Sequence, residues 1–189
     1  FFASSIGYLF LGAFLLATLF LFFWVETFFA RNIADVRPLF EWLPILLIFL
    51  TAALTMRMWS EERRSGTLEF ISTLPVSTWE FVVGKFLACW ALLGLALVLT
   101  LPLPLTVALL GDLDWGPVFA GYIAAMLLGG AYIAIGLFVS ARTDSQIISL
   151  IGSTLVCGVF YLLGSTAIVE LFGADLRNFL AAIGSGSRF

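Results

Sequence analysis

The residues of this sequence that could do chemistry are few, and most of them lie in one polar segment. The 189 residues include 12 acidic and 9 basic residues and no histidine. No carboxylates are paired inside an apolar run, and no cysteine or aspartate cluster has the spacing of metal ligands. Cys89 and Cys157 lie in uncharged runs, which favours small buried apolar residues over a disulfide or a metal site. These residue types argue against an enzyme.

The Gly84-Lys85 pair is the one place where a nucleotide-binding motif could end. A P-loop needs a glycine five positions before this pair and a serine or threonine directly after it. Trp79 and Phe86 occupy those two positions, so the chain cannot by itself hydrolyse a nucleotide. The net charge of −3 and the scattered basic residues also argue against a nucleic-acid partner, which needs clustered Lys and Arg.

The elements that must position these residues follow from the composition. Hydrophobic residues make up 62% of the chain and charged residues 11%, whereas a soluble domain has about 25% charged residues. A bilayer core of about 30 Å is crossed by roughly 20 apolar residues in a helix. Four uncharged runs reach that length, at 1–25, 86–111, 115–141 and 145–169.

A fifth, shorter run at 42–56 reaches spanning length if Arg57 snorkels toward a head group and the helix continues through Met58, Trp59 and Ser60. We therefore predict an all-α, polytopic membrane helix bundle that forms a single domain over residues 1–189. The chain begins with Phe1, so we expect it to be an interior piece of a longer protein. The five predicted spans are about 7–29, 43–60, 79–110, 117–141 and 145–170, and a short interfacial helix is expected at about 174–183.

Prolines and small residues predict details within these spans. Pro44 is expected in the first turn of the second span, where its missing N–H costs nothing. Pro102 and Pro104 predict a kink or an unwound end in the third span. Pro117 is expected to open the fourth span. In that span the small residues that repeat every four positions predict close helix packing: Gly121, Ala125 and Gly129.

The segment from Arg57 to Lys85 is the longest polar stretch of the chain. Within it, Leu68, Ile71 and Leu74 have helical spacing, which predicts a short amphipathic helix that Pro75 ends. After it, a capping box that starts at Ser77 predicts the beginning of the third span. A second capping box that starts at Thr143 and ends at Gln146 predicts the beginning of the fifth span.

Basic residues do not decide which end of the bundle faces the cytoplasm. Five lie on one side and four on the other, namely Arg57, Arg63, Arg64, Lys85 and Arg142 against Arg31, Arg37, Arg177 and Arg188. This difference is too small for the positive-inside rule. The interiors of the spans carry no charge, whereas ion-coupled carriers place ionisable residues at mid-membrane despite a cost of about 2.5–3.5 kcal/mol each. An energy source in another subunit fits this pattern better.

Three stretches together resemble a known family: Glu61–Glu69 (EERRSGTLE), Thr73–Ser77 (TLPVS) and Gly84–Phe86 (GKF). They are similar to the cytoplasmic loop after the second span of ABC-2-type transporter permeases, especially the subgroup that includes gliding-motility-type permeases. The similarity extends along nearly the whole chain, through Arg31-Asn32 and the Gly111–Gly116 turn.

This resemblance implies a multi-pass protein of the plasma (inner) membrane of a bacterium, with an inward N-terminus. It implies six spans in the full subunit, so the sixth would lie beyond Phe189. Two permease copies would assemble with two separate cytoplasmic ATPase subunits, which bind ATP and Mg, and this chain would hold no cofactor. The region 61–77 would contain the coupling helix that contacts the ATPase. The residues expected at that contact are Glu61, Glu62, Arg63, Gly66, Thr67, Leu68, Glu69 and Ile71.

The resemblance also implies that residues 30–41 and 111–116 lie outside the cell. The leading hypothesis is the membrane subunit of an ATP-driven exporter. Two alternatives stay open, namely a membrane scaffold that recruits a cytoplasmic partner without transport, and an intramembrane enzyme that acts on lipid. An ordinary solvated loop is the alternative for the segment from Arg57 to Lys85 itself, because charged runs are usually just that. An ATPase with a P-loop that co-purifies with the chain would favour transport.

Overall fold

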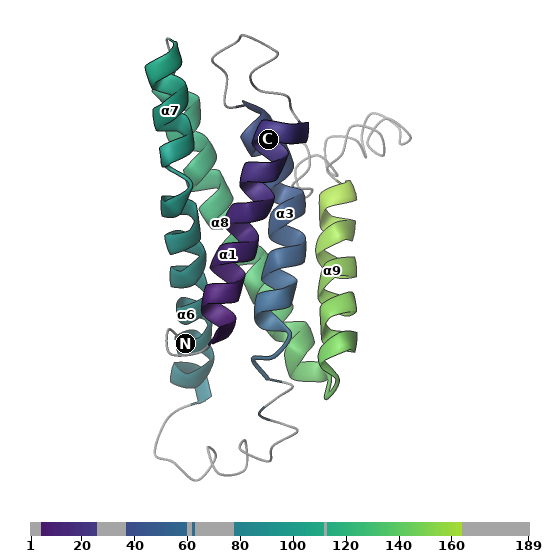
Figure 1. Cartoon of the computed structure of the whole chain (residues 1–189). Helices are drawn as coiled ribbons and strands as arrows, with labels where there is room; N and C mark the ends of the chain where they lie inside the picture. Colours follow the sequence, from purple (N-terminus) through teal and green to yellow (C-terminus); the bar gives the residue numbers. More distant parts are fainter. Residues whose placement is uncertain (1–4, 26–36, 60–61, 63–77, 112, 164–189) are drawn as a thin grey trace, which may run out of the picture.

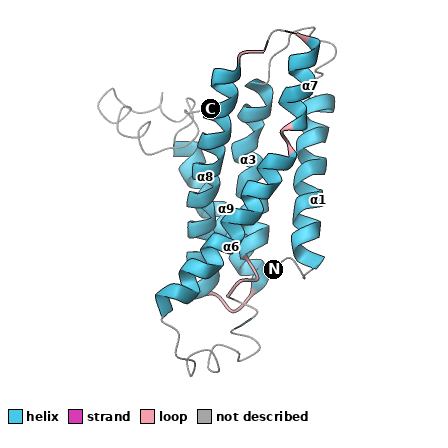
Figure 2. Ribbon diagram, turned by 90° about the vertical axis from the view of Figure 1, so that its left-hand side faces the viewer, coloured by secondary structure: helices cyan, strands magenta, loops and turns pink. Residues whose placement is uncertain are grey.

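A computed structural model describes residues 5–25, 37–59, 62, 78–111 and 113–163 of the chain (Figure 1). Helices and short loops account for all of the described residues, with no strand among them (Figure 2). The predicted all-α membrane helix bundle is confirmed. Its elements are α1 (Ser5–Phe20), the π-helical turn η1 (Leu21–Val25), α3 (Arg37–Thr55), α6 (Thr78–Leu99), α7 (Pro102–Leu110), α8 (Trp115–Arg142) and α9 (Gln146–Leu163).

The helices stand side by side, and successive long helices run in opposite directions (Figure 1). Helix α3 packs against α1, α8 and α9, while α8 also packs against α6 and α9. The beginnings of α1 and α6 therefore lie at the same end of the bundle as the ends of α3 and α8. We call this end the Lys85 end. It contains Trp59, the first turns of α6 and residues 142–145.

Three helices are long and apolar enough to cross a membrane, among the residues described: Trp79–Leu109, Trp115–Arg142 and Gln146–Leu163. Two shorter apolar helices, Gly7–Phe23 and Leu39–Thr55, lie over the first two predicted spans. Many large apolar side chains of these helices, such as Leu109 and Leu127, point outward. A bilayer provides the apolar surroundings that such surfaces require.

The second predicted span was wrong at both ends. Helix α3 begins at Arg37, so Pro38 and not Pro44 lies in its first turn, and Pro44 lies inside the helix. The predicted continuation to Ser60 is also wrong, because α3 ends at Thr55. The Met58 N–H donates to the Thr55 carbonyl oxygen at 3.0 Å, three residues back, and this tighter turn replaces the α-helical pattern.

The predicted proline kink in the third span is confirmed. Thr100 and Leu101 separate α6 from α7, and Pro102 and Pro104 have no N–H to continue the helical ladder. The backbone N–H groups of Thr100 and Leu101 instead donate three residues back, at 3.1 Å each. The Thr100 hydroxyl lies 2.9 Å from the Tyr122 hydroxyl of α8, which ties the kink to the neighbouring helix.

The small residues of α8 provide the close packing that their spacing predicted. A Cβ at Gly121 would lie 2.6 Å from the Phe40 ring of α3, and Ala125 is fully buried. A Cβ at Gly129 would overlap the Leu93 side chain of α6. No side chain larger than hydrogen fits at these glycines without movement of a neighbour, so α8 approaches α3 and α6 closely.

Two helix starts differ from the prediction. Helix α8 begins at Trp115 rather than Pro117, because the Asp114 carboxylate caps it by accepting the Gly116 N–H at 3.0 Å. Thr143 caps the end of α8 and not the beginning of α9, since its hydroxyl donates to the Val139 carbonyl oxygen at 3.4 Å. Helix α9 begins after Ser145, whose carbonyl oxygen accepts the first helical N–H. The Ser77 cap lies outside the described residues.

Candidate functional site

The predicted contact with an ATPase lies mostly outside the described residues. Of the eight residues expected there, the structure describes Glu62. The other seven stay predictions: Glu61, Arg63, Gly66, Thr67, Leu68, Glu69 and Ile71. The same holds for the rest of the region 61–77 and for the interfacial helix at 174–183. What the structure does describe is how Glu62 and the helices on either side of this region are held.

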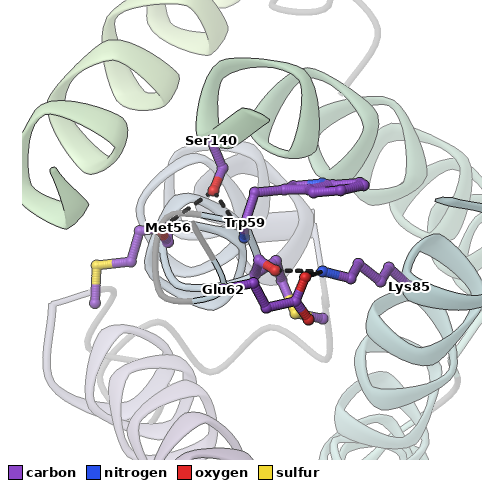
Figure 3. A network of polar contacts seen from close by, with 6 residues as sticks. Met56, Trp59, Glu62, Lys85 and Ser140 are labelled. Carbon is purple, nitrogen blue, oxygen red and sulfur yellow. Dashed lines mark hydrogen bonds and ion pairs between the residues drawn. The ribbon is translucent and has the colours of Figure 1, made fainter. Parts of the chain in front are cut away.

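Lys85 is the centre of a polar cluster at this end of the bundle (Figure 3). Its Nζ donates to the Glu62 carboxylate and to the Met58 carbonyl oxygen, both at 2.5 Å. The side chain of Lys85 is 10% exposed and that of Glu62 29%, so water screens this ion pair only in part. Lys85 lies two turns into α6, Met58 follows α3, and Glu62 lies near the start of the predicted coupling region. One side chain thus joins three parts of the chain.

Two aromatic rings complete the surroundings of the Lys85 ammonium group. Its Nζ lies 4.1 Å from the centre of the Trp59 ring and 4.6 Å from the centre of the Phe81 ring. The two rings also meet edge to face, with their centres 5.6 Å apart. Phe81 precedes Lys85 by four residues, so both side chains lie on one face of α6. The negative faces of the rings stabilise the ammonium charge where water is partly excluded.

Ser140 of α8 holds the backbone that follows α3. Its hydroxyl donates to the Met56 carbonyl oxygen and accepts the Trp59 N–H, both at 3.3 Å (Figure 3). These backbone groups lie just beyond the last turn of α3, where the backbone lacks hydrogen-bond partners within the helix. Ser140 is fully buried and supplies the missing partners from another helix. The end of α3 is therefore fixed to α8 as well as to α6.

We call this arrangement the Lys85 cluster; it comprises Met56, Met58, Trp59, Glu62, Phe81, Lys85 and Ser140. Its chemistry is that of binding and positioning. Within the described ranges, no group of three or more histidines, cysteines and carboxylates could hold a metal ion.

Sequence reasoning placed Lys85 at the end of the polar segment but assigned it no contact. A signal was present, because Lys85 is followed by a long uncharged run and an apolar helix needs a counter-charge for such a residue. Phe81, four residues before Lys85, was a further sign that the lysine ammonium group lies against an aromatic ring. Nothing in the sequence pointed to Ser140, which lies more than fifty residues beyond Lys85.

Farther along the bundle, a second polar contact joins α6 to α8. The Trp90 indole N–H donates to the Met126 carbonyl oxygen at 3.1 Å. A Cβ at Gly130 would lie only 3.1 Å from the same indole nitrogen, so the glycine leaves room for the ring. This bond holds α6 against α8 about one and a half turns beyond Lys85.

Comparison with protein-family models matches residues 30–178 to the family described as ABC-2 family transporter protein. The match spans more than half of the chain and contains the whole Lys85 cluster and the region 61–77. Comparison with curated proteins gave no match, and comparison with solved structures gave none either.

Proposed function

Because the chain belongs to the ABC-2 transporter family, we propose that it couples ATP hydrolysis in a separate cytoplasmic subunit to export across the membrane. The chain is a multi-pass membrane protein and a permease component of an ABC transporter. In our proposal, two permease copies and two ATPase subunits form the complete exporter in the plasma membrane of a bacterium. The Lys85 end faces the cytoplasm. The gliding-motility subgroup stays a prediction.

The observation that carries this proposal is the attachment of Glu62 to α6. In the proposal, the ATPase moves the region 61–77, and that movement reaches Glu62 first because Glu62 lies near the start of the region. The Lys85 ion pair then passes the movement to α6, and the turn held by Ser140 passes it to α8. A partly buried, hydrogen-bonded ion pair suits this task because it resists displacement more than a solvated loop does.

The contact with the ATPase is proposed for the short amphipathic helix within the region 61–77. Leu68 and Ile71 would fill an apolar groove of the ATPase. The charged rim would comprise Glu61, Glu62, Arg63 and Glu69. Interface cores are depleted of charge while their rims keep it, which is the basis for this division. Gly66 and Thr67 would form the turn that leads into the helix.

Two substitutions test coupling at the ion pair between Glu62 and Lys85, and Lys85→Met is the one that leaves all eight proposed docking residues in place. Lys85→Met and Glu62→Gln each break the ion pair, so each should reduce the stimulation of ATP hydrolysis by the permease. We expect a loss of at least about fivefold, because coupling energies between linked sites are about 1–3 kcal/mol. The double variant should lose no more than either single variant, since both remove the same interaction. ATP hydrolysis by the complete transporter in lipid vesicles is the measurement.

Co-purification of the ATPase subunit is the matched control and should be unchanged in Lys85→Met, because Lys85 is not one of the proposed docking residues. Normal stimulation together with normal co-purification would remove the Lys85 cluster from the coupling path. Leu68→Asp tests the docking helix separately, and it should abolish co-purification. A Leu68→Asp variant that binds the ATPase and stimulates it normally would refute the coupling-helix assignment. If no ATPase co-purifies with the unaltered chain, the scaffold alternative is favoured instead.

A further inference from the structure

A groove of about 250 Å³ lies between α1 and α3 toward the Lys85 end of the bundle. Phe10 and Leu54, both buried, form part of its lining. Leu9, which is 72% exposed, lies at its edge, so the groove opens to the outside of the bundle. Its surface is almost wholly apolar over the helical part. A groove of this kind on a membrane helix bundle faces hydrocarbon and not water.

Arg57 lies at the end of the groove and changes its chemistry. It is exposed, it lies two residues beyond the end of α3, and it is the one charged residue among the described residues that line the groove. An arginine at a helix end reaches the level of the lipid head groups, where its planar guanidinium can bind a phosphate through two parallel hydrogen bonds. Along the groove, the lining therefore changes from apolar to cationic. A phospholipid changes in the same direction, from an apolar acyl chain to a negatively charged phosphate.

We propose that this groove binds an anionic phospholipid, with an acyl chain between α1 and α3 and the head-group phosphate at Arg57. The sequence predicts only that Arg57 reaches toward head groups, and it does not predict the groove. The positive charge selects the anionic lipid, because a basic residue near an anionic membrane surface contributes about 1 kcal/mol. The groove adjoins the Lys85 cluster at Met56, which belongs to both, but the proposed lipid site does not depend on ATPase coupling.

A second groove provides an internal comparison. It has about 350 Å³, lies between α6 and α8, and is lined by residues such as Gly94, Leu97, Val118 and Tyr122. Its described lining contains no charged side chain. This groove should accept acyl chains of any phospholipid without preference for the head group.

The test uses the full-length transporter in phosphatidylcholine vesicles that contain a small fraction of a photoactivatable lipid. The probe is phosphatidylglycerol or phosphatidylcholine with a diazirine in the acyl chain, and labelled peptides are located by mass spectrometry. We expect phosphatidylglycerol to label α1 and α3 around the groove more strongly than phosphatidylcholine does. Arg57→Gln should lower the phosphatidylglycerol labelling about fivefold, which corresponds to about 1 kcal/mol for one basic residue, and should leave phosphatidylcholine labelling unchanged.

Two further variants sharpen the result. Arg142→Gln is the matched control, because Arg142 is also exposed at this end but lies on α8 against the Phe138 ring, 5.0 Å from its centre. It should leave the labelling between α1 and α3 unchanged. Ala53→Trp fills the groove and should remove the labelling by both lipids. Equal labelling by the two lipids, or an Arg57→Gln variant that labels like the unaltered protein, would overturn the proposal. Either result would leave the proposed coupling function untouched.

Discussion

Gly136 of α8 offers a quantitative test of how closely α3 and α8 are packed. A Cβ added at Gly136 would overlap the Thr55 hydroxyl and would lie only 3.0 Å from the Thr55 Cβ. The Thr55 Cβ is fixed to the backbone of α3, so no rotation of the side chain can relieve this overlap. Its hydroxyl is held as well, because it donates to the Thr51 carbonyl oxygen at 2.8 Å. Gly136→Ala must therefore push the two helices apart.

The size of the effect follows from two opposing terms. Overpacking a tight interior costs about 1–3 kcal/mol. Replacing glycine by alanine inside a helix also gains about 1 kcal/mol from backbone propensity. Gly158 of α9 supplies the matched control, because a Cβ there meets nothing within 4 Å. Both variants share the propensity gain, so the difference in stability between Gly136→Ala and Gly158→Ala isolates the overpacking cost of about 1–3 kcal/mol.

The assay is equilibrium unfolding in mixed micelles with increasing sodium dodecyl sulfate, followed by circular dichroism of the helices. Gly136→Ala should unfold at a lower detergent fraction than Gly158→Ala, and Gly158→Ala should unfold at or above the fraction of the unaltered protein. If the two variants unfold together, the close contact between α3 and α8 at Thr55 does not exist. Helices α3 and α8 would then not be closely packed at this position.

Two more predictions concern the same helices and their orientation. Trp90→Phe removes the indole bond to Met126 and should lower stability in the same assay by about 0.6 kcal/mol, a typical value for an interhelical hydrogen bond in a membrane; an unchanged midpoint would contradict this. A thiol reagent applied outside the cell should modify an Asp114→Cys variant and spare a Ser65→Cys variant, because Asp114 caps the beginning of α8 and the end of α8 lies at the Lys85 end. The reverse labelling pattern would overturn the topology.

The helical fold could be predicted because long uncharged runs permit few other structures. Helix boundaries were harder to predict where the first turn of a helix contains polar residues. Helix α3 extends back to Arg37, and hydropathy cannot detect such a polar first turn. Two prolines, Pro38 and Pro44, each suit a first turn, so the choice between them depended on where the helix begins. The apolar run favoured Pro44, and the structure has Pro38 there.

The contacts of the candidate site were beyond prediction from local patterns. Lys85 joins Glu62 across 23 residues and Met58 across 27. Ser140 joins Trp59 across 81 residues and Met56 across 84. Capping boxes and amphipathic spacing describe residues within one or two helical turns, so they carry no information about such pairs. The error at Thr143 has the same cause. The capping-box pattern is present in the sequence, but the Thr143 hydroxyl donates to the Val139 carbonyl oxygen of the preceding helix.

The two kinds of contact at the Lys85 end differ in stiffness, and this difference bears on how movement would pass through the bundle. Helices α3 and α8 pack closely at Gly121 and Gly136, and α6 packs as closely against α8 at Gly129, where a Cβ would overlap the Leu93 side chain. Helix α6 is also held by the long side chains of Lys85 and Trp90, which can change rotamer without separating the backbones. Under the proposed function, a displacement of Glu62 would reach α6 through the Lys85 ion pair and α8 through the turn that Ser140 holds.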